Sequence, residues 1–275
     1  MNATEQTGAP TAPSALVTGL LADLDAERES LAALLADAPA SSWALPTPAP
    51  GWAIQHQIAH LAFFDRAAAI SVGDPDSFAA ERNAADADPD GYGAAVLEPY
   101  LAMTGPQLLV AWRAAGRGFA EVSTRAVPKL RAPWYGPSMT VPSMVTARIM
   151  ETWAHGQDVV DALGVARLES PRLAHVARLA CLARPNPYLV RGLELPTSPV
   201  RVELTMADGG SWSWGETDAE QVIRGGLLDF CQVMTRRRHV DDTDLLAEGS
   251  EAEEWLSIGQ AYAGDPGPGR QPEKS

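Results

Sequence analysis

The sequence has few cysteines and no long hydrophobic segment. Cys181 and Cys231 are the only cysteines in 275 residues, and both fall in apolar, helix-like contexts. A chain of this length can bury a sizeable core without disulfides. A cysteine content this low is typical of proteins in a reducing compartment. We find no signal peptide and no apolar run long enough to span a membrane. These absences predict a cytoplasmic protein with no membrane partner.

Positive charge is also scarce, because 21 Lys and Arg residues stand against 35 Asp and Glu residues, for a formal net charge of −14. A nucleic-acid partner requires a basic face that neutralises phosphates, so this composition argues against DNA or RNA binding. Two enzyme signatures are missing as well. The glycine-containing segment 224–226 lacks the strand-turn-helix context of a phosphate-binding loop, and we recognise no Ser-His-Asp or Cys-His arrangement.

The first 185 residues are instead rich in alanine, and their prolines mostly separate helix-like segments. Within them, the proline-rich segment 127–142 carries an exposed-looking Trp134-Tyr135 pair, which we interpret either as a lip over a pocket or as a simple connector. The pattern predicts a helical bundle, with helices at about 12–37, 53–72, 92–103, 104–126, 142–163 and 170–183.

The pattern changes after Pro196. Residues 200–206 and 211–214 alternate between apolar and polar side chains on either side of an Asp-Gly-Gly turn, which predicts a β-hairpin. Helices are expected at about 217–237 and 250–262, with a short strand or extended piece near 243–247. We therefore predict an α+β protein with a disordered segment at 1–13, a helical bundle over 14–190, a small α/β domain over 191–263 and a disordered tail at 264–275.

The most informative segment is METWAHGQD at 150–158, in a helix predicted to end at Gly164. Glu151 and His155 are four residues apart, so both side chains lie on one face of that helix, with Asp158 one turn further on. A carboxylate and an imidazole in this arrangement can share one divalent metal ion. They can equally belong to an ordinary solvated face, opposite the apolar stripe of an amphipathic helix.

His60 is the candidate for a third ligand. The helix predicted over 53–72 is apolar on two sides, and Ile54, Ile58 and Leu61 form one of its stripes. A helix of this kind is usually an interior one, so we expect His60 to be buried. Its ring nitrogens would then be satisfied either by structural hydrogen bonds or by a metal ion.

The two motifs together resemble the mycothiol-dependent maleylpyruvate isomerase family, which belongs to the wider group of DinB-like metal-binding helical bundles. The residues that carry the resemblance are Gly51, Trp52, Ala59, His60 and Leu61, then Glu151, Trp153, His155, Gly156 and Asp158. The resemblance covers nearly the whole chain and implies a DinB-like bundle followed by a small sterol-carrier-like α/β domain. It also implies a divalent metal site with His60, Glu151 and His155 as ligands, usually zinc. Two histidines and one carboxylate also accept nickel, iron or manganese.

The same resemblance implies an enzyme of an actinobacterial type, an isomerase or S-transferase that acts on a small acidic molecule. The metal would activate a thiol, that of mycothiol, or a water for addition to the substrate. Asp158 would orient a metal ligand or contact the thiol cofactor, unless it is a solvated helix aspartate. An arginine would bind a substrate carboxylate, and we prefer Arg237 over Arg236 and Arg238, unless all three simply complement a helix dipole.

One position departs from the family pattern, which often has an acidic residue where this chain has His56. Four protein ligands would close a metal site against chemistry, so we interpret His56 as a hydrogen-bond partner of a metal ligand or as a surface substitution. Two alternative functions stay open: a metal-dependent tailoring enzyme, such as a cyclase, that does not use mycothiol, and a non-catalytic metal or ligand carrier. We expect a monomer or a homodimer with a small-molecule ligand.

Overall fold

The computed structural model describes residues 14–127 and 129–273, and the chain divides into two compact units. The first unit comprises Met1–Pro46 and Pro50–Arg148, and the second comprises Thr47–Ala49 and Ile149–Ser275. The division falls inside one long helix, whereas we expected the domain boundary near residue 190. The segment 1–13, predicted to be disordered, lies outside the described residues.

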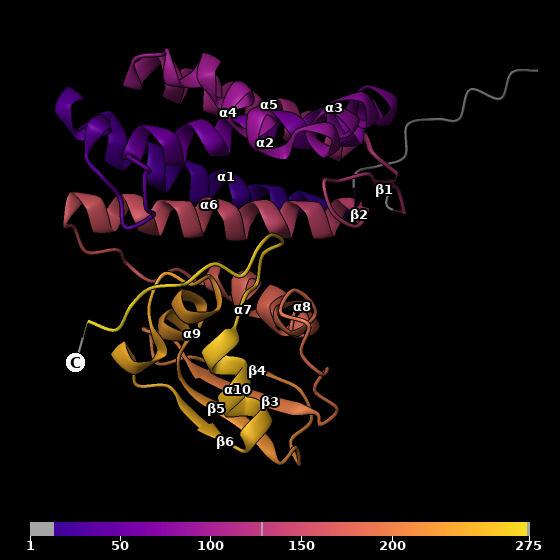
Figure 1. The fold of residues 1–275 in the computed structure, drawn as a ribbon, viewed down its shortest axis with the longest axis vertical. Helices are drawn as coiled ribbons and strands as arrows, with labels where there is room; N and C mark the ends of the chain where they lie inside the picture. Colours follow the sequence, from indigo (N-terminus) through magenta and orange to yellow (C-terminus); the bar gives the residue numbers. More distant parts are fainter. Residues whose placement is uncertain (1–13, 128, 274–275) are drawn as a thin grey trace, which may run out of the picture. The chain divides into compact units, whose positions relative to one another are not determined.

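The first unit is a helical bundle, as its alanine-rich composition predicts (Figure 1). α2 packs against α3, α4 and α5, and α1 packs against α5. The two apolar sides of α2 explain this central position, because Ile54, Ile58 and Leu61 are all fully buried. The elements are α1 (Ala15–Ala36), the 3-10 helix η1 (Ala40–Ala44), α2 (Ile54–Gly73), α3 (Pro75–Ala87), α4 (Pro89–Leu101), α5 (Gly105–Arg125), the short strands β1 (Arg131–Ala132) and β2 (Met139–Thr140), and the first part of α6 (Val141–Leu163).

A charged cluster lies in the core of this bundle. The Asp65 carboxylate has no exposed surface and accepts hydrogen bonds from Arg28 Nε at 2.9 Å, Arg148 Nε at 2.8 Å and Trp112 Nε1 at 3.0 Å. Burial alone would raise the pKa of Asp65, but the two guanidinium groups together outweigh that effect, so its pKa lies below the usual value. The cluster joins α1, α2, α5 and α6 through groups that are charged and paired.

α3 was not predicted from the sequence, and neither was the short helix α8 (Pro185–Leu189). The sequence of α3 is mostly Ala, Asp and polar residues, and only Phe78 is buried, so it has no apolar periodicity to detect. A start signal is nevertheless present. Asp74 accepts a hydrogen bond from the backbone N–H of Ser77 at 3.1 Å and precedes Pro75, the preferred residue for a first helical turn.

The Trp134-Tyr135 pair is less exposed than its sequence context suggested. Both side chains are half-buried, and the Trp134 ring stacks on Phe78 with centroids 5.7 Å apart and an interplanar angle of 5°. Tyr135 packs edge-on against Phe64 at 5.6 Å. The connector that carries the pair is therefore fixed to the bundle by aromatic contacts.

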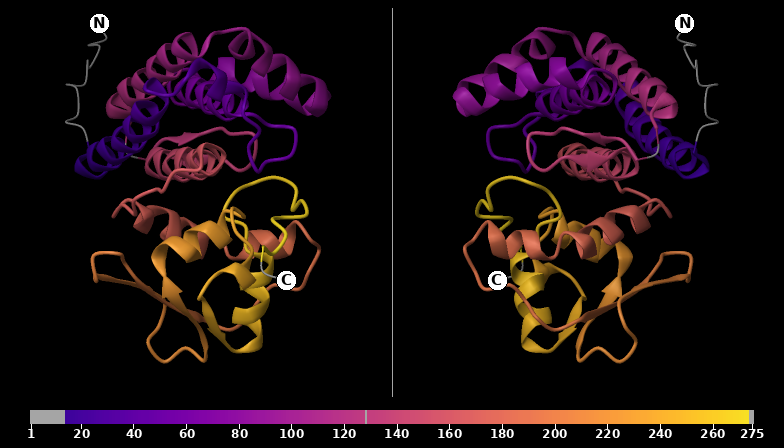
Figure 2. Two further views of the ribbon diagram at one scale, coloured as in Figure 1. Left: turned by 90° about the vertical axis from the view of Figure 1, so that its left-hand side faces the viewer. Right: turned by 90° about the vertical axis from the view of Figure 1, so that its right-hand side faces the viewer.

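The second unit is built on a four-stranded sheet in the order β4-β3-β5-β6, whose strands are labelled in Figure 1. Figure 2 gives two further views of this unit. β3 and β4 form the predicted antiparallel hairpin, β5 runs parallel to β3, and β6 is antiparallel to β5. Helices α7, α9 and α10 contact this sheet, and the core contains Trp153 from α6 together with Phe230 and Trp255. The elements are α7 (Leu173–Leu182), α8 (Pro185–Leu189), β3 (Val200–Thr205), β4 (Ser211–Trp214), β5 (Gln221–Gly226), α9 (Leu227–Met234), the 3-10 helix η2 (Val240–Asp242), β6 (Leu246–Glu248) and α10 (Ser250–Ile258).

The single helix predicted over 217–237 was wrong, because its first half is the strand β5. Val222 and Ile223 are β-branched and buried, and the strand pairs with β3 on one side and with β6 on the other. At Gly225 φ is 151°, and a side chain there would meet Leu245, so this position favours glycine. Only the second half of the predicted segment is helical, as α9.

α6 ends where the sequence predicts. Gly164 follows its last residue with a φ of 64°, the left-handed conformation of a helix C-terminus. Cys181 and Cys231 are free and buried in α7 and α9, as their apolar contexts suggested. In the described part of the chain, no helix has both the length and the apolar character needed to cross a membrane.

Candidate metal centre

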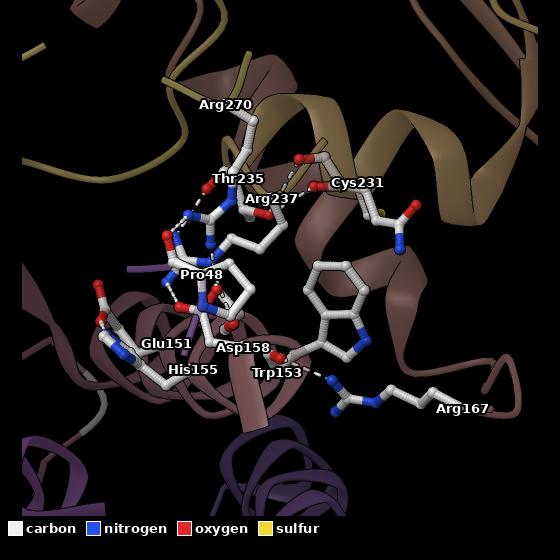
Figure 3. A network of polar contacts seen from close by, with 12 residues as sticks. Pro48, Glu151, Trp153, His155, Asp158, Arg167, Cys231, Thr235, Arg237 and Arg270 are labelled. Atoms are coloured by element: carbon white, nitrogen blue, oxygen red, sulfur yellow. Dashed lines mark hydrogen bonds and ion pairs between the residues drawn. The ribbon is translucent and has the colours of Figure 1, made fainter. Parts of the chain in front are cut away.

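Glu151 and His155 lie on one face of α6, as their spacing predicts (Figure 3). The Oε2 atom of Glu151 is 3.2 Å from the Nε2 atom of His155, and their side chains are 25% and 13% exposed. An imidazole nitrogen and a carboxylate oxygen at this distance either share a proton or face a common cation. The pair is thus partly shielded from solvent while its polar atoms point toward each other.

His60 lies on α2 and is half-buried, so the expectation of a buried side chain was wrong. Its ring lies among aromatic neighbours, with centroids 5.4 Å from Trp52 and 4.4 Å from Phe64. These contacts fix the plane of the imidazole, which is useful for a ligand that must hold one direction. Trp52 belongs to the same motif as His60, so the motif supplies both the candidate ligand and part of its support.

One ligand atom from each of His60, Glu151 and His155 lies within 4.8 Å of the other two, so the three residues form a group that could hold a metal ion. Two neutral imidazoles and one carboxylate match the donor types of catalytic zinc sites, in which three protein ligands leave a further position for water or substrate. The donor chemistry therefore fits a divalent ion. All three side chains are partly exposed, so a small molecule can approach such an ion.

His56 has a local structural role. Its Nδ1 atom accepts a hydrogen bond from the backbone N–H of Ala53 at 3.1 Å, which caps the first turn of α2. An imidazole at the third helical position can replace the usual Glu or Gln of a capping box because it also offers an acceptor. This role was not predicted from the sequence, although the position of His56 three residues after the N-cap residue Ala53 was a usable signal.

Asp158 is buried, so its interpretation as a solvated helix aspartate was wrong. Its side chain is 1% exposed and lies between two guanidinium groups. Oδ2 accepts a hydrogen bond from Arg237 Nη2 at 3.0 Å, and Oδ1 accepts one from Arg270 (Figure 3). A buried carboxylate needs such partners, and here two arginines from the C-terminal part of the chain supply them.

Arg237 is the member of the 236–238 triplet that contacts α6. Its Nη2 binds Asp158, its Nε donates to the carbonyl of Ala154 at 3.1 Å, and its Nη1 donates to the carbonyl of Thr235 at 2.7 Å. Ala154 and Asp158 lie on either side of His155 in the helix. The guanidinium thus holds the turn of α6 that carries one of the candidate metal ligands.

Arg270 was not anticipated, because it lies in the segment 264–275 that we expected to be disordered. The structure describes this segment as far as Glu273, with Arg270 bound to Asp158 and to the carbonyl of Pro48. The backbone N–H of Glu273 also donates to both carboxylate oxygens of Asp242, at 3.0 and 2.9 Å. The composition of the tail gives no sign of these contacts, since each depends on a residue far away in the sequence.

The tail also lines a cavity of about 430 Å³ in the second unit. Arg237, Arg238 and Arg270 contribute positive charge to its wall, and Asp161 and Glu273 contribute negative charge. Burial raises the pKa of Asp161, and the nearby carboxylate of Asp158 raises it further. The mixed charges make this cavity a polar one.

Comparison with known proteins decides the family. A family model described as the mycothiol maleylpyruvate isomerase N-terminal domain matches residues 24–160. Two uncharacterized proteins of Mycobacterium tuberculosis, from strains CDC 1551 / Oshkosh and ATCC 25618 / H37Rv, are each 46% identical over 251 residues, which cover 91% of this chain and 97% of theirs. The chain belongs to the mycothiol maleylpyruvate isomerase family. The resemblance seen in its two motifs is confirmed.

Solved structures support the fold of this family member. The crystal structures of a mycothiol-dependent maleylpyruvate isomerase and of a mutant of it align with a TM-score of 0.59, covering 86% of this chain and 95% of theirs. Sequence identity in these alignments is 12%, so the likeness concerns the fold alone. The predicted α+β class, a DinB-like helical bundle with a smaller α/β domain, is confirmed.

Proposed function

We propose that this protein is a metal-dependent enzyme in which His60, Glu151 and His155 hold one divalent ion and a thiol or water is activated there for addition to a small molecule. The observation that carries the proposal is the group of three donor atoms within 4.8 Å of one another. Membership of the mycothiol maleylpyruvate isomerase family supports a thiol as the activated group. We further propose that mycothiol is the thiol donor.

The three side chains suit this role chemically. Both histidines must be neutral to bind a metal, and Glu151 must be ionised, so the ligand set carries one negative charge. A bound divalent ion would lower the pKa of the thiol or water in the open position. Zinc suits two imidazoles and one carboxylate, and nickel, iron and manganese are accepted by the same donors.

Asp158 and Arg237 enter the proposal as positioning residues for His155. Arg237 binds the helix at Ala154 and at Asp158, so it fixes the direction in which the intervening imidazole points. A substrate carboxylate could also reach Arg237, since its side chain is 13% exposed. A bidentate guanidinium would suit that task. Replacement of Arg237 distinguishes the two roles. If Arg237 binds the substrate directly, the Michaelis constant rises while the metal content changes little. If it only positions His155, the metal content falls.

Metal analysis tests the ligand set. Purified wild type is expected to contain a stoichiometric divalent ion after incubation with zinc and gel filtration, whereas His60→Ala, Glu151→Ala and His155→Ala lose most of it. Removal of one of three ligands weakens binding strongly because the remaining two cannot complete the coordination. His56→Ala is the matched control, since this histidine lies one turn away and caps α2 instead. Equal metal content in all five proteins would refute the assignment.

Activity tests the thiol. The zinc-loaded protein is expected to accelerate the conversion of maleylpyruvate or a related unsaturated acid only when mycothiol is present, and a chelator should abolish that rate. Metal dependence without any response to mycothiol would favour a tailoring enzyme that uses an activated water instead. A protein that binds the metal but accelerates neither reaction would be a carrier.

A further inference from the structure

A second cavity, of about 480 Å³, lies in the helical unit beside His60. Its wall comes from α2, from α4 and from the connector that carries Tyr135. Among the described residues that line it, none is Asp, Glu, Lys or Arg. Its main side chains are Trp52, Phe63, Phe64, Tyr92, Leu97 and Tyr135. This volume lies within the range of about 300–1,000 Å³ that is usual for small-molecule sites.

The aromatic wall is held in place by its own contacts. The rings of Phe63 and Phe64 meet edge to face at 5.0 Å, and Phe63 and Tyr92 do so at 6.3 Å. The hydroxyl groups of Tyr92 and Tyr135 are 3.3 Å apart and share a hydrogen bond. Trp134, stacked on Phe78, anchors the neighbouring Tyr135. The cavity is therefore a preformed feature of the bundle rather than a gap that side chains could easily fill.

The wall also carries the uncharged hydroxyl group of Tyr135. Burial raises the pKa of Tyr135, and its hydrogen bond with Tyr92 raises it further, so this hydroxyl stays protonated at neutral pH. On α4 the lining includes Gly93, which has no side chain, and Ala94, which has only a methyl group, so both leave space open. His60 is the one group in the lining that can bind a metal ion.

We propose that this cavity receives an uncharged apolar or aromatic part of the substrate, next to the reacting end at His60. The inference rests on the proposed function, which places the reacting end of the substrate at His60. The class of substrate that it names, with an uncharged apolar or aromatic part, does not include maleylpyruvate. Away from the ion proposed at His60, the described lining offers no Lys or Arg, so a second carboxylate of a dicarboxylate would lose its hydration there without gaining a cationic partner. An aryl or alkyl group gains burial and ring contacts instead.

Binding of a neutral fluorescent probe, N-phenyl-1-naphthylamine, tests the cavity directly. We expect the wild-type protein to bind it equally well with zinc and after chelation. Naphthalene should displace the probe, and maleate, a dianion without an apolar part, should leave it bound even at millimolar concentration. Displacement by maleate as effective as that by naphthalene would overturn the proposal.

Two variants place the probe. Val96 lines the cavity and packs against its aromatic cluster, whereas Val110 on α5 is 65% exposed and outside the lining. Val96→Asp should weaken probe binding by about tenfold or more because a carboxylate then borders an apolar site. Val110→Asp should leave it unchanged. Probe binding that is the same in both variants would count against this site.

A second pair of variants tests the same site in case Val96→Asp does not fold. Ala94 and Ala95 are adjacent, exposed alanines on α4, and only Ala94 lines the cavity. Ala94→Glu is expected to weaken binding of the probe, whereas Ala95→Glu is expected to leave it unchanged. The circular dichroism spectrum should be unchanged in both variants. An equal effect of the two substitutions would overturn the placement.

Turnover separates this inference from the proposed function. With zinc and mycothiol present, thiol addition to the neutral aryl enone benzylideneacetone should proceed with a higher kcat/KM than conversion of maleylpyruvate. A higher kcat/KM for maleylpyruvate would overturn the inference and leave the proposed function intact. If the wild-type protein binds the probe as expected but does not retain zinc after incubation and gel filtration, the proposed function is overturned and the cavity's apolar preference stands.

Discussion

Two buried aspartates, one in each unit, have nearly the same chemical environment, but the arginines that pair with them are held in different ways. Asp65 and Asp158 are 0% and 1% exposed, and each carboxylate lies between two guanidinium groups. The arginines of Asp65 lie on helices and are 4% and 3% exposed. Those of Asp158 follow α9 or lie in the C-terminal tail, and they are 13% and 21% exposed.

This difference indicates which of the two clusters is a fixed part of the fold. Both arginines that bind Asp65 lie on helices that also pack through apolar side chains. Forming the ion pairs therefore costs little additional conformational entropy. Arg270 lies in an irregular segment that is attached by single contacts, among them its own ion pair with Asp158 and the bond from Glu273 to Asp242. We therefore expect the Asp65 cluster to be lost only with the bundle, and the Asp158 cluster to open one arginine at a time.

Replacing Asp65 should have the largest effect. Asp65→Ala leaves Arg28 and Arg148 as buried, unpaired charges, and we expect the free energy of unfolding to fall by about 3–5 kcal/mol. Urea denaturation followed by circular dichroism measures it. Glu29→Ala, which breaks the exposed ion pair with Arg113, is the control and should change stability by less than about 1 kcal/mol. A loss at Asp65 no larger than at Glu29 would contradict this view of the core.

Acid should act on the same cluster. Because the pKa of Asp65 in the folded protein lies below its unfolded value, its contribution is fully present above the unfolded pKa of about 4 and is lost as the pH falls through the folded pKa. The stability difference between wild type and Asp65→Asn should be constant from neutral pH down to about pH 5 and then shrink. Urea titrations at several pH values test this, and a difference that grows toward low pH would disprove it.

Arg237→Ala should have an intermediate effect. It removes three hydrogen bonds and one of the two charges that neutralise Asp158, so we expect a loss of about 2–3 kcal/mol. Metal content should also fall if Arg237 positions His155, which distinguishes this variant from a purely structural one. Arg238→Ala is the control, because the neighbouring Arg238 has no hydrogen bond to Asp158 among the described contacts. Thermal unfolding with and without zinc measures both effects.

Arg270→Ala should have the smallest effect. Asp158 keeps its partner Arg237, and the lost ion pair is partly exposed, so the expected change in stability is about 1 kcal/mol. Limited proteolysis should show faster cleavage within 264–273, since the tail loses one of its attachments. Arg125→Ala, at an exposed pair on α5, is the matched control for proteolysis. Unchanged cleavage would mean that Arg270 does not hold the tail.

The sequence was sufficient wherever structure depends on local pattern. The helices at α1, α2, α5 and α6 follow from apolar periodicity, the β3-β4 hairpin from alternation around a turn, and the pairing of Glu151 with His155 from helical spacing. The family resemblance added the association of His60 with that pair. Apart from that association, each of these signals lies within a few residues of the feature that it predicts.

The sequence was insufficient where distant residues decide. β5 looked helical because the pairing that makes it a strand involves β3 and β6, which it meets only in the folded sheet. α3 lacked periodicity because it buries little more than Phe78. The burial of Asp158 could not be predicted either, since one of its two partners is Arg270, in a segment without a sequence signal.

The attachment of the tail has a practical consequence for how this protein is prepared. Glu273 is only two residues from the end of the chain, and its backbone bonds Asp242. An affinity tag or fusion partner joined shortly after Glu273 would extend a segment that is anchored by the contacts of Arg270 and Glu273, close to the carboxylate of Asp158. Preparations of this protein that are compared in metal and activity assays should therefore all carry the same sequence after Glu273.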